Sequence, residues 1–375
     1  MNIPMVDLQG QYRKLKTEID SEIQKVLDSS TYINGPAVNE FAADLAKYLG
    51  VKHVIPCANG TDALQVAMMA LDLKPGDEVI TTTFTFIATA EVIALLGLTP
   101  VLVDVLEDTM NIDPAALRKA ITPKTKAIVP VHLFGQCANM DEIMAIAEEH
   151  NLYVIEDNAQ AIGANYTFKN GTVKKAGTIG HIGCTSFFPS KNLGAYGDGG
   201  AIFTNDDKMA EQMRVVVNHG MKVRYYHDYV GINSRLDSIQ AAILKVKLPH
   251  LDDFAKARNY AANYYNTAFA SCEKIITPIT ADFTDHVFHQ YTLVLNQVDR
   301  EGLQKHLSDK GISNAVYYPV PLHQQKAYRD ERYQDGAFPV AEKLAANVMS
   351  LPIHTELTDE QLKFITDAVL EFVNK

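Results

Sequence analysis

The sequence has few cysteines and no tryptophan. Its four cysteines in 375 residues are Cys57, Cys137, Cys184 and Cys272, and none belongs to a Cys-x-x-Cys pair. This pattern fits a reduced, intracellular protein with buried thiols better than a disulfide scaffold or a zinc module. We therefore predict no metal site.

Long apolar runs are also scarce. The segment from Val92 to Val103 contains Gly97 and Pro100 and is too short to span a bilayer. The N-terminal residues MNIPMVDLQGQYRKLK lack the apolar core of a signal peptide. We expect a soluble cytoplasmic protein that does not bind a membrane.

Two glycine-rich nucleotide-binding motifs are missing as well. Neither a P-loop nor a GxGxxG fingerprint occurs in the chain. ATP hydrolysis and Rossmann-type NAD binding therefore have no support from a motif.

The chain has fewer positively than negatively charged residues. With 34 Lys+Arg against 45 Asp+Glu the formal net charge is −11, which disfavours nucleic-acid binding. It does not exclude a small anionic ligand, because a few cations can dominate a pocket. The 47% hydrophobic residues are typical of a folded protein, and the length predicts about two domains.

Strands and helices alternate between about residues 50 and 205. The predicted strands are His53–Cys57, Glu78–Thr82, Pro100–Val105, Lys126–Leu133, Leu152–Ile155, Cys184–Phe188 and Gly200–Thr204. The helices between and after them are Thr61–Leu71, Ala88–Leu96, Pro114–Ala120, Met140–His150 and Lys208–His219. This order predicts an α/β fold with a mainly parallel sheet flanked by helices, and ligands on such sheets bind at the carboxyl ends of the strands.

The rest of the chain predicts a smaller α/β C-terminal domain. Its expected elements are helices Arg300–Lys310 and Asp359–Val373 and strands Gln290–Leu295 and Ala315–Tyr318. Before it, Leu236–Lys247 is a predicted helix of the large domain, and Leu251–Ala270 is a predicted helix that links the two domains. We therefore divide the chain into a large domain, residues 1–250 with an N-terminal helical segment, and residues 251–375, a linking helix and the small domain.

Three positions in the large domain are candidates for binding chemistry. Gly60 and Thr61 stand where a strand passes into a helix, whose N-terminus attracts anions; a plain turn and N-cap fits equally well. Asp157 ends an apolar strand and can hold a protonated ring nitrogen, or it can simply form a turn. Lys191 lies in a Gly-rich, otherwise apolar segment where burial would free its amine for reaction with an aldehyde; most lysines are instead solvated.

The order of these three positions suggests one cofactor. Pyridoxal phosphate (PLP) needs a helix N-terminus for its phosphate, an acid for its pyridinium nitrogen and a lysine for its aldehyde. This chain has all three in order: the predicted helix N-terminus at Gly60 and Thr61, then Asp157, then Lys191.

Several longer segments carry a family resemblance. CANGTDAL, TTFTFIATAE, VIEDNAQAIGA, TSFFPSKNLGAYGDGGAIFTN and GINSRLDSIQAAIL resemble the DegT/DnrJ/EryC1/StrS sugar aminotransferases. The resemblance extends from YINGPAV to LPIH. It implies a PLP-dependent transferase of fold type I that works as a homodimer with composite active sites.

The resemblance also implies roles for individual residues. Lys191 corresponds to the lysine that binds PLP covalently, and Asp157 to the partner of the pyridinium nitrogen. The other cofactor positions are Gln160 near the ring and its 3-oxygen, Gly60, Thr61 and Ser186 at the phosphate, Phe86 over the ring, and Asn233 reaching the phosphate from the neighbouring subunit. Phe86 could instead be core packing, and Asn233 a turn residue.

The family moves the amino group of glutamate to nucleotide-linked 3-keto or 4-keto hexoses. The resemblance is closest to members that aminate UDP-2-acetamido-2-deoxy-3-oxo-glucuronate for bacterial surface polysaccharide. Arg235 would then grip a carboxylate of glutamate or of the uronate, or form an interface ion pair. The remaining positions in the sugar or nucleotide pocket are Tyr32, Ser190, Tyr317, Tyr318 and His323.

Tyr317 stands where those uronate-aminating members have His, and His323 follows in the same loop. A neutral 3-keto or 4-keto dTDP- or UDP-hexose is therefore the alternative substrate. A PLP-dependent dehydratase of this fold has His in place of the lysine, which the Lys191 segment argues against. A non-catalytic PLP-binding regulator is the third alternative.

Overall fold

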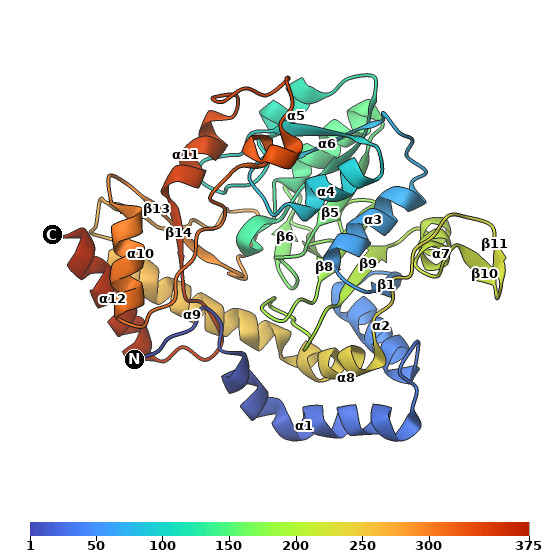
Figure 1. Ribbon diagram of the computed structural model, residues 1–375, viewed down its shortest axis with the longest axis horizontal. Coiled ribbons are helices and arrows are strands. Elements are labelled where there is room, and N and C mark those ends of the chain that lie inside the picture. Colours follow the sequence, from blue (N-terminus) through green and yellow to red (C-terminus); the bar gives the residue numbers. More distant parts are fainter. Residues whose placement is uncertain (375) are drawn as a thin grey trace.

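The computed structural model describes residues 1–374. Its centre is a seven-stranded sheet (Figure 1) with the order β1 (His53–Cys57), β9 (Gly200–Thr204), β8 (Ile182–Ser186), β5 (Tyr153–Asp157), β4 (Thr125–Val129), β2 (Glu78–Thr82) and β3 (Thr99–Val103). Strand β9 runs antiparallel to both its neighbours, and the other pairs are parallel. The predicted mainly parallel sheet is confirmed.

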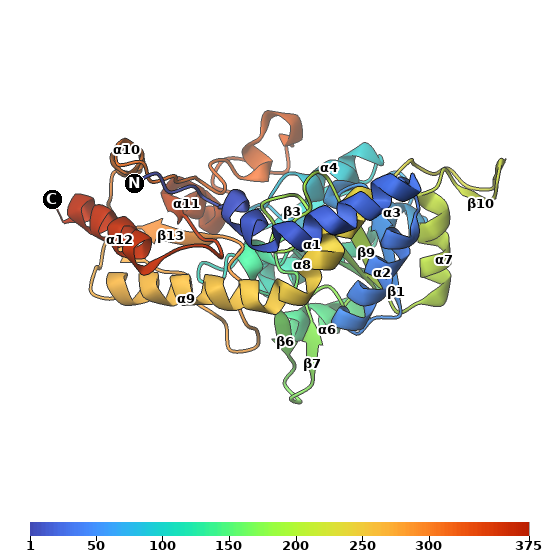
Figure 2. The same cartoon turned by 90° about the horizontal axis from the view of Figure 1, so that it is seen from below.

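Helices cover both faces of this sheet, which is why its strands are apolar without alternation. Val79 packs beneath one layer of helices and its neighbour Ile80 beneath the other. The first layer contains α3 (Gly60–Ala70), α4 (Ala88–Leu95) and α7 (Asp207–Val216). The second contains α2 (Pro36–Leu49), α5 (Pro114–Ala120), α6 (Met140–His150) and α8 (Ser238–Lys247). Helix α1 (Leu8–Ser29) lies across α8 (Figure 2).

The C-terminal elements form a second cluster around a small antiparallel sheet. The sheet has the order β12 (Ile275–Ile276), β13 (Tyr291–Leu295) and β14 (Val348–Leu351). It packs with α9 (Leu251–Phe269), α10 (Arg300–Asp309) and α12 (Asp359–Val373). Ile3 also belongs to this cluster, so the first residues of the chain pack with the last elements.

The predicted strand Ala315–Tyr318 is wrong. Ala315 forms an isolated bridge with Ser350, and the chain then leaves the sheet so that Tyr317 and Tyr318 line a cavity. The aromatic residues that made this segment resemble a strand line the wall of the cavity instead of pairing in a sheet.

Helix α11 (Pro339–Asn347) ties the C-terminal elements to the central sheet. Asp104, just after β3, accepts hydrogen bonds from the backbone N–H of Val340 (3.1 Å) and Ala341 (2.9 Å). These donors belong to the first turn of the helix, where N–H groups have no intrahelical partner. Asp104 thus caps a helix that lies more than 230 residues further along the chain.

Two hairpins and four short 3₁₀ turns complete the fold. The hairpins are β6–β7 (Asn165–Thr167, Val173–Lys175) and β10–β11 (Met221–Val223, Tyr226–His227). The 3₁₀ turns are Leu133–Gly135, Leu248–His250, Leu322–Gln324 and Lys326–Tyr328. Hairpin β10–β11 projects from the body (Figure 1) and exposes Val223, Tyr225 and Tyr226.

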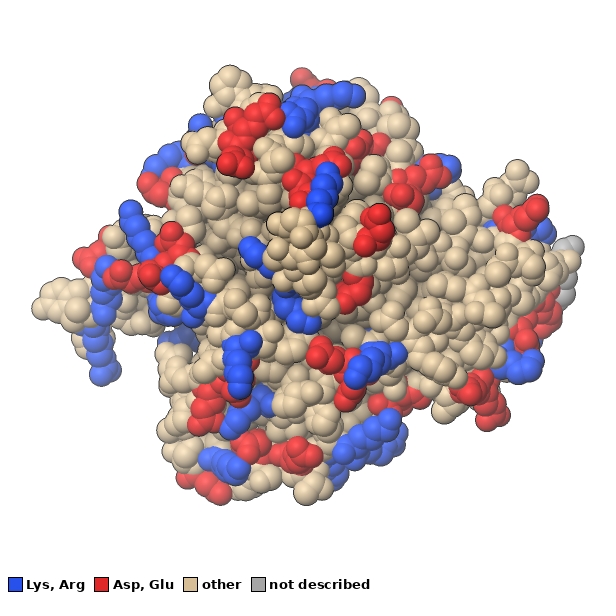
Figure 3. Space-filling model, turned by 180° about the vertical axis from the view of Figure 1, so that it is seen from behind, with Lys and Arg blue, Asp and Glu red and all other residues tan. Residues whose placement is uncertain are grey.

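Charged side chains of both signs are interspersed on the face shown in Figure 3. Within residues 1–374, none of the helices has the length and apolar character needed to cross a membrane.

Candidate active site

A cavity of about 760 Å³ lies at the carboxyl ends of the central strands. It brings together ten of the predicted site residues: Gly60, Thr61, Phe86, Asp157, Gln160, Ser186, Ser190, Lys191, Tyr317 and Tyr318. They come from segments between residues 60 and 318, so the fold itself assembles the site.

The N-terminus of α3 forms one end of the cavity. Asn59 is its N-cap and accepts a hydrogen bond from Asp62 N–H (2.8 Å). Gly60 lies so close to Ser186 that a Cβ at position 60 would stand 2.7 Å from the Ser186 Cβ. Glycine is therefore required for this close approach, which brings the helix terminus and the Ser186 hydroxyl to one place suited to a phosphate.

Asp157 is held by two hydrogen bonds at the end of β5. Its Oδ2 accepts from the Thr89 hydroxyl (2.8 Å) and its Oδ1 from Ala159 N–H (3.1 Å). The residue is 6% exposed. Two donors fix the direction of a buried carboxylate, which can then pair with a protonated ring nitrogen.

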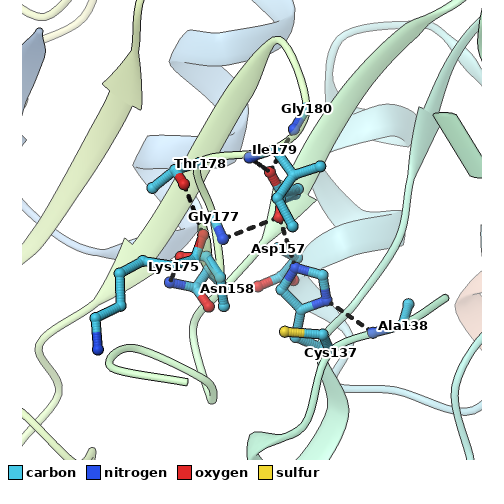
Figure 4. Close-up of polar contacts among 12 residues, drawn as sticks. Cys137, Ala138, Asp157, Asn158, Lys175, Gly177, Thr178, Ile179 and Gly180 are labelled. Carbon is cyan, nitrogen blue, oxygen red and sulfur yellow. Dashed lines mark hydrogen bonds and ion pairs between the residues drawn. The ribbon is translucent and has the colours of Figure 1, made fainter. Parts of the chain in front are cut away.

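Glu156, the preceding residue, is fully buried, and its side chain points to the opposite face of β5 because side chains alternate along a strand. Figure 4 shows Gly177, Ile179 and Gly180, whose N–H groups surround its carboxylate. Its carboxylate accepts hydrogen bonds from the N–H groups of Gly177 (2.9 Å), Ile179 (2.6 Å) and Gly180 (2.5 Å). His132 Nδ1 accepts from Ala138 N–H, so its Nε2 donates to Glu156 at 2.8 Å. This network fixes the end of β5 that carries Asp157.

We expect Glu156→Gln to lower the free energy of unfolding by about 3 kcal/mol, since an amide NH₂ would face backbone donors in a buried site. Denaturant unfolding measures the change. Glu149→Gln, which alters an exposed ion pair with Arg118, should change stability by less than about 1 kcal/mol. Equal effects for the two variants would contradict the structural role of Glu156.

Lys191 lies on a tight turn that several hydrogen bonds close. Its N–H donates to Phe188 O (2.8 Å), and the neighbouring Asn192 Nδ2 donates to Val287 O (2.8 Å). Burial lowers the pKa of Lys191 to about 8, although the charge of Asp157 acts to raise it. About a tenth of the amine is therefore neutral near pH 7, far more than at the ordinary pKa of lysine, and the neutral form is the one that reacts with an aldehyde.

Aromatic side chains form another part of the cavity wall. The ring of Tyr318 stacks on Phe134 with 6.4 Å between centroids and lies 6.3 Å from Phe86. Gln160 Nε2 donates to the Tyr318 hydroxyl oxygen (3.0 Å), while its Oε1 accepts from Phe134 N–H (2.7 Å). Burial raises the pKa of Tyr318, so the phenol stays protonated.

Four predicted residues do not line this cavity. Tyr32 and Asn233 are exposed, and Arg235 lines a separate cavity of about 420 Å³. His323 is buried behind the wall, where its Nδ1 lies 2.8 Å from the Thr83 hydroxyl and its Nε2 lies 3.1 Å from a Glu342 oxygen.

Three residues of the site were not predicted from the sequence. Thr89 lies within the quoted TTFTFIATAE segment but carries no motif of its own. His289 and Gln290 also line the cavity. They lie directly before β13, at the start of the predicted strand Gln290–Leu295, and nothing in the local sequence shows that this segment reaches the cavity.

With this geometry in place, comparison with known proteins decides the family. The model of the DegT/DnrJ/EryC1/StrS aminotransferase family matches residues 13–370. The chain belongs to this family. The predicted resemblance is confirmed.

Three relatives cover nearly the whole chain. A protein of Geobacillus stearothermophilus named pleiotropic regulatory protein is 50% identical over 99% of both chains. The UDP-2-acetamido-2-deoxy-3-oxo-D-glucuronate aminotransferase of Pseudomonas aeruginosa is 47% identical, covering 98% of this chain and 99% of that one. The UDP-N-acetyl-3-dehydro-alpha-D-glucosamine 3-aminotransferase of Acidithiobacillus ferrooxidans is 46% identical over 98% and 97%.

A solved structure agrees closely with the fold. DesV of S. venezuelae, crystallised in complex with a ketimine intermediate, superposes with a TM-score of 0.95 at 40% identity, covering 100% of this chain and 99% of that one. The predicted fold class, a PLP-dependent transferase fold, is confirmed.

The protein is a PLP-dependent aminotransferase, and its cavity fits that cofactor. The α3 terminus with Thr61 and Ser186 would hold the phosphate, Asp157 the ring nitrogen and Lys191 the aldehyde. The bound cofactor supplies an electron sink for the carbon that loses a proton.

Proposed function

We propose that the protein transfers the amino group of L-glutamate to a nucleotide-linked 3-keto sugar for bacterial surface polysaccharide. UDP-2-acetamido-2-deoxy-3-oxo-glucuronate is the first candidate, because the 47% identical relative carries that activity in its name. The observation that carries the proposal is the single cavity shared by Lys191, Asp157 and the α3 terminus.

In this proposal each side chain has a physical task. Asp157, oriented by Thr89 and Ala159 N–H, stabilises the proton on the ring nitrogen. The neutral Lys191 amine moves a proton from the amino-acid Cα, because burial has lowered its pKa to about 8. The Tyr318 hydroxyl, whose oxygen already accepts from Gln160, can donate to a group on the substrate.

We further propose a homodimer with shared sites, because the cavity of one chain is short of positive charge. Asp62, Asp157 and Asp198 line it, and Lys191 is the one Lys or Arg that does so within residues 1–374. The cofactor, glutamate and a nucleotide diphosphate are all anionic. Asn233 and Arg235, which line no part of this cavity, would enter the site of the neighbouring subunit.

Mixing two inactive variants should restore activity if the sites are shared. Subunits with Lys191→Ala and subunits with Arg235→Ala would form hybrid dimers with one intact site each. Random exchange gives about a quarter of the wild-type rate, since half of the dimers are hybrids. The rate of 2-oxoglutarate release, measured with hybrid content by mass spectrometry, checks this. Hybrids without activity would place Arg235 in the site of its own subunit.

A neutral 3-keto sugar is the second candidate. Burial raises the pKa of Tyr317, and Gln290 hydrogen-bonds its side chain, so this position offers an uncharged phenol rather than a cation for a sugar carboxylate. The 46% identical relative is named for a neutral 3-keto sugar.

The deciding experiment combines purified protein, PLP and glutamate with a panel of nucleotide keto-sugars. Release of 2-oxoglutarate with the 3-keto uronate, at least about tenfold faster than with its neutral analogue, is expected if Arg235 binds the sugar carboxylate. The reverse preference selects the neutral candidate. The absence of sustained release with every sugar of the panel would overturn the proposal and favour a PLP-binding regulator.

The division of the chain into a cofactor-binding domain, residues 1–250, and a smaller C-terminal domain, residues 251–375, also remains our proposal. The separate hydrophobic cluster around β13 supports it. We place the enzyme in the cytoplasm, in keeping with four free cysteines.

A further inference from the structure

His323 occupies a place that its predicted role in the sugar or nucleotide pocket does not explain. It is 2% exposed and does not line the cavity. Both nitrogens of its ring nevertheless have polar partners from other segments, namely Thr83, just after β2, and Glu342 of α11. A buried side chain with two such partners joins three parts of the chain behind the cavity wall.

The positions of the protons in this set follow from its acceptors. The Glu342 carboxylate can only accept, so His323 Nε2, which lies 3.1 Å from it, carries a proton and donates. In the neutral imidazole Nδ1 is then the acceptor, and the Thr83 hydroxyl donates to it at 2.8 Å. The Thr83 oxygen in turn accepts from His323 N–H (3.3 Å). Both ring nitrogens and the hydroxyl are thereby satisfied, which fixes the orientation of the ring.

Glu342 is itself held in place, so the set ends at a fixed point. Both oxygens of its carboxylate accept from Gly336 N–H (2.8 and 3.0 Å). Its helix, α11, is also tied to the end of β3 by Asp104. Strands β2 and β3 are neighbours in the sheet. Thr83 after the one and Asp104 after the other therefore close a frame that runs through His323 and α11.

Two routes connect this frame to Tyr318 in the cavity wall. Along the chain, four residues separate Tyr318 from His323, and two of them are prolines, whose φ is fixed. Through space, Phe84, the residue after Thr83, meets the Tyr318 ring edge-on with 6.2 Å between centroids. Leu322 N–H also donates to Thr83 O (2.8 Å). A displacement of His323 would therefore be passed on to the Tyr318 ring.

The direction of the Tyr318 hydroxyl decides whether it can meet a substrate. Its oxygen accepts from Gln160 Nε2 (3.0 Å), which leaves the phenol proton for a group in the cavity. A hydrogen bond weakens steeply when its angle bends, so a small rotation of the ring would impair this donor.

We propose that His323 is a positioning residue that, held between Thr83 and Glu342, fixes the Tyr318 hydroxyl for the substrate, a role that rests on the proposed function. The effect of His323 on the reaction then passes through Tyr318. It should vanish when the hydroxyl is absent.

The test follows the first half of the reaction, in which an amino acid reacts with the PLP form of the full-length enzyme. Loss of the visible absorbance of PLP joined to lysine reports the rate, and the amino acid is the one that reacts fastest with the wild type. Both substrates use one cavity, so in this proposal Tyr318 meets the amino acid as well. The readout needs no keto-sugar, so its failure is distinct from failure of the proposed substrate.

A double-mutant cycle separates positioning through Tyr318 from a general structural role. We expect Tyr318→Phe to lower the second-order rate constant about tenfold and His323→Phe about fivefold. The double variant should stay within about twofold of Tyr318→Phe alone, because the direction of an absent hydroxyl has no consequence. Independent effects would instead multiply to about fiftyfold. That result, or a single variant without effect, overturns the proposal.

A conservative variant adds a second check. His323→Asn, whose side-chain carbonyl can still accept from the Thr83 hydroxyl, should be slowed less than His323→Phe. Equal slowing of the two would contradict the anchoring of His323 at Thr83. If His323→Phe does not fold, Thr83→Val removes the same hydrogen bond with a smaller change and takes its place in the cycle.

His354→Phe is the matched control. His354 is also 2% exposed, and its Nδ1 accepts from Glu356 N–H (3.2 Å). It does not line the cavity, so the rate should stay within about twofold of wild type even if the free energy of unfolding falls. Slowing equal to that of His323→Phe would show that loss of any buried histidine impairs the enzyme, and would overturn the proposal.

Discussion

Replacing Lys191 with alanine is expected to reduce transamination by roughly 10³-fold or more, because one amine both binds the cofactor and transfers the proton. The protein should still fold, since the turn is closed by backbone bonds such as Lys191 N–H to Phe188 O. The measurement is 2-oxoglutarate release under saturating PLP. Lys174→Ala, on the exposed strand β7, is the control and should leave the rate within about twofold of wild type.

The structure also predicts where a covalent label will appear. Lys247 is a second buried lysine, and burial followed by the charge of Arg258 lowers its pKa to about 7. Its amine, however, donates to Gly194 O and lies outside the cavity. Borohydride reduction and peptide mapping should therefore label Lys191. A label on Lys247, or substantial activity in Lys191→Ala, would contradict the assignment.

Asp157→Asn is expected to lower kcat by roughly 10²–10³-fold, in the range seen when one preorganised electrostatic group is removed. The amide keeps the size of the side chain but cannot stabilise a proton on the ring nitrogen. Initial rates at saturating glutamate and keto-sugar measure the loss. Asp113→Asn is the matched control, because Asp113 caps α5 and Asn caps helices equally well.

Thr89→Val should give a smaller loss in the same direction. The Thr89 hydroxyl supplies one of the two donors to Asp157, and its removal leaves the charge but loosens its direction. We expect about a tenfold fall in kcat, since one hydrogen bond to a charged group contributes about 1.5–3 kcal/mol. A Thr89→Val effect as large as that of Asp157→Asn would show that the hydroxyl acts on more than the carboxylate.

The sequence predicts the central sheet well because local signals and packing agree there. Val79 and Ile80 are both buried under helices, so the strand is apolar throughout. Helix α6 has the predicted bounds, since Met140, Ile143 and Ala147 form one buried apolar face, and the structure adds caps at Asn139 and Asn151. Where an element is two residues long, as β12 is, or follows a helix without a turn, as β14 follows α11, no periodic pattern exists to detect.

In the active site, too, the residues that follow strands could be predicted and those placed by long-range contacts could not. Asp157 and Thr61 could be predicted because they follow strands of a parallel sheet, whose carboxyl ends meet at one edge. The backbone of His289 is held by a hydrogen bond from Arg258 to its carbonyl. Because the two residues are far apart in the sequence, no local pattern predicts this contact. The wrong strand at Ala315–Tyr318 has the same origin, since the sequence shows aromatic residues but not which surface they cover.

The Asp104 cap on α11 limits how relatives can be recombined. A chimera joining residues 1–250 of one parent to residues 251–375 of another would take the acceptor from the first and the donors, Val340 N–H and Ala341 N–H, from the second. Every residue except proline supplies a backbone N–H, whereas only a side chain with an oxygen in the right place can accept. A chimera therefore keeps this cap only if the first parent has a suitable oxygen-bearing side chain at position 104. The parent that supplies residues 251–375 can vary widely in sequence there.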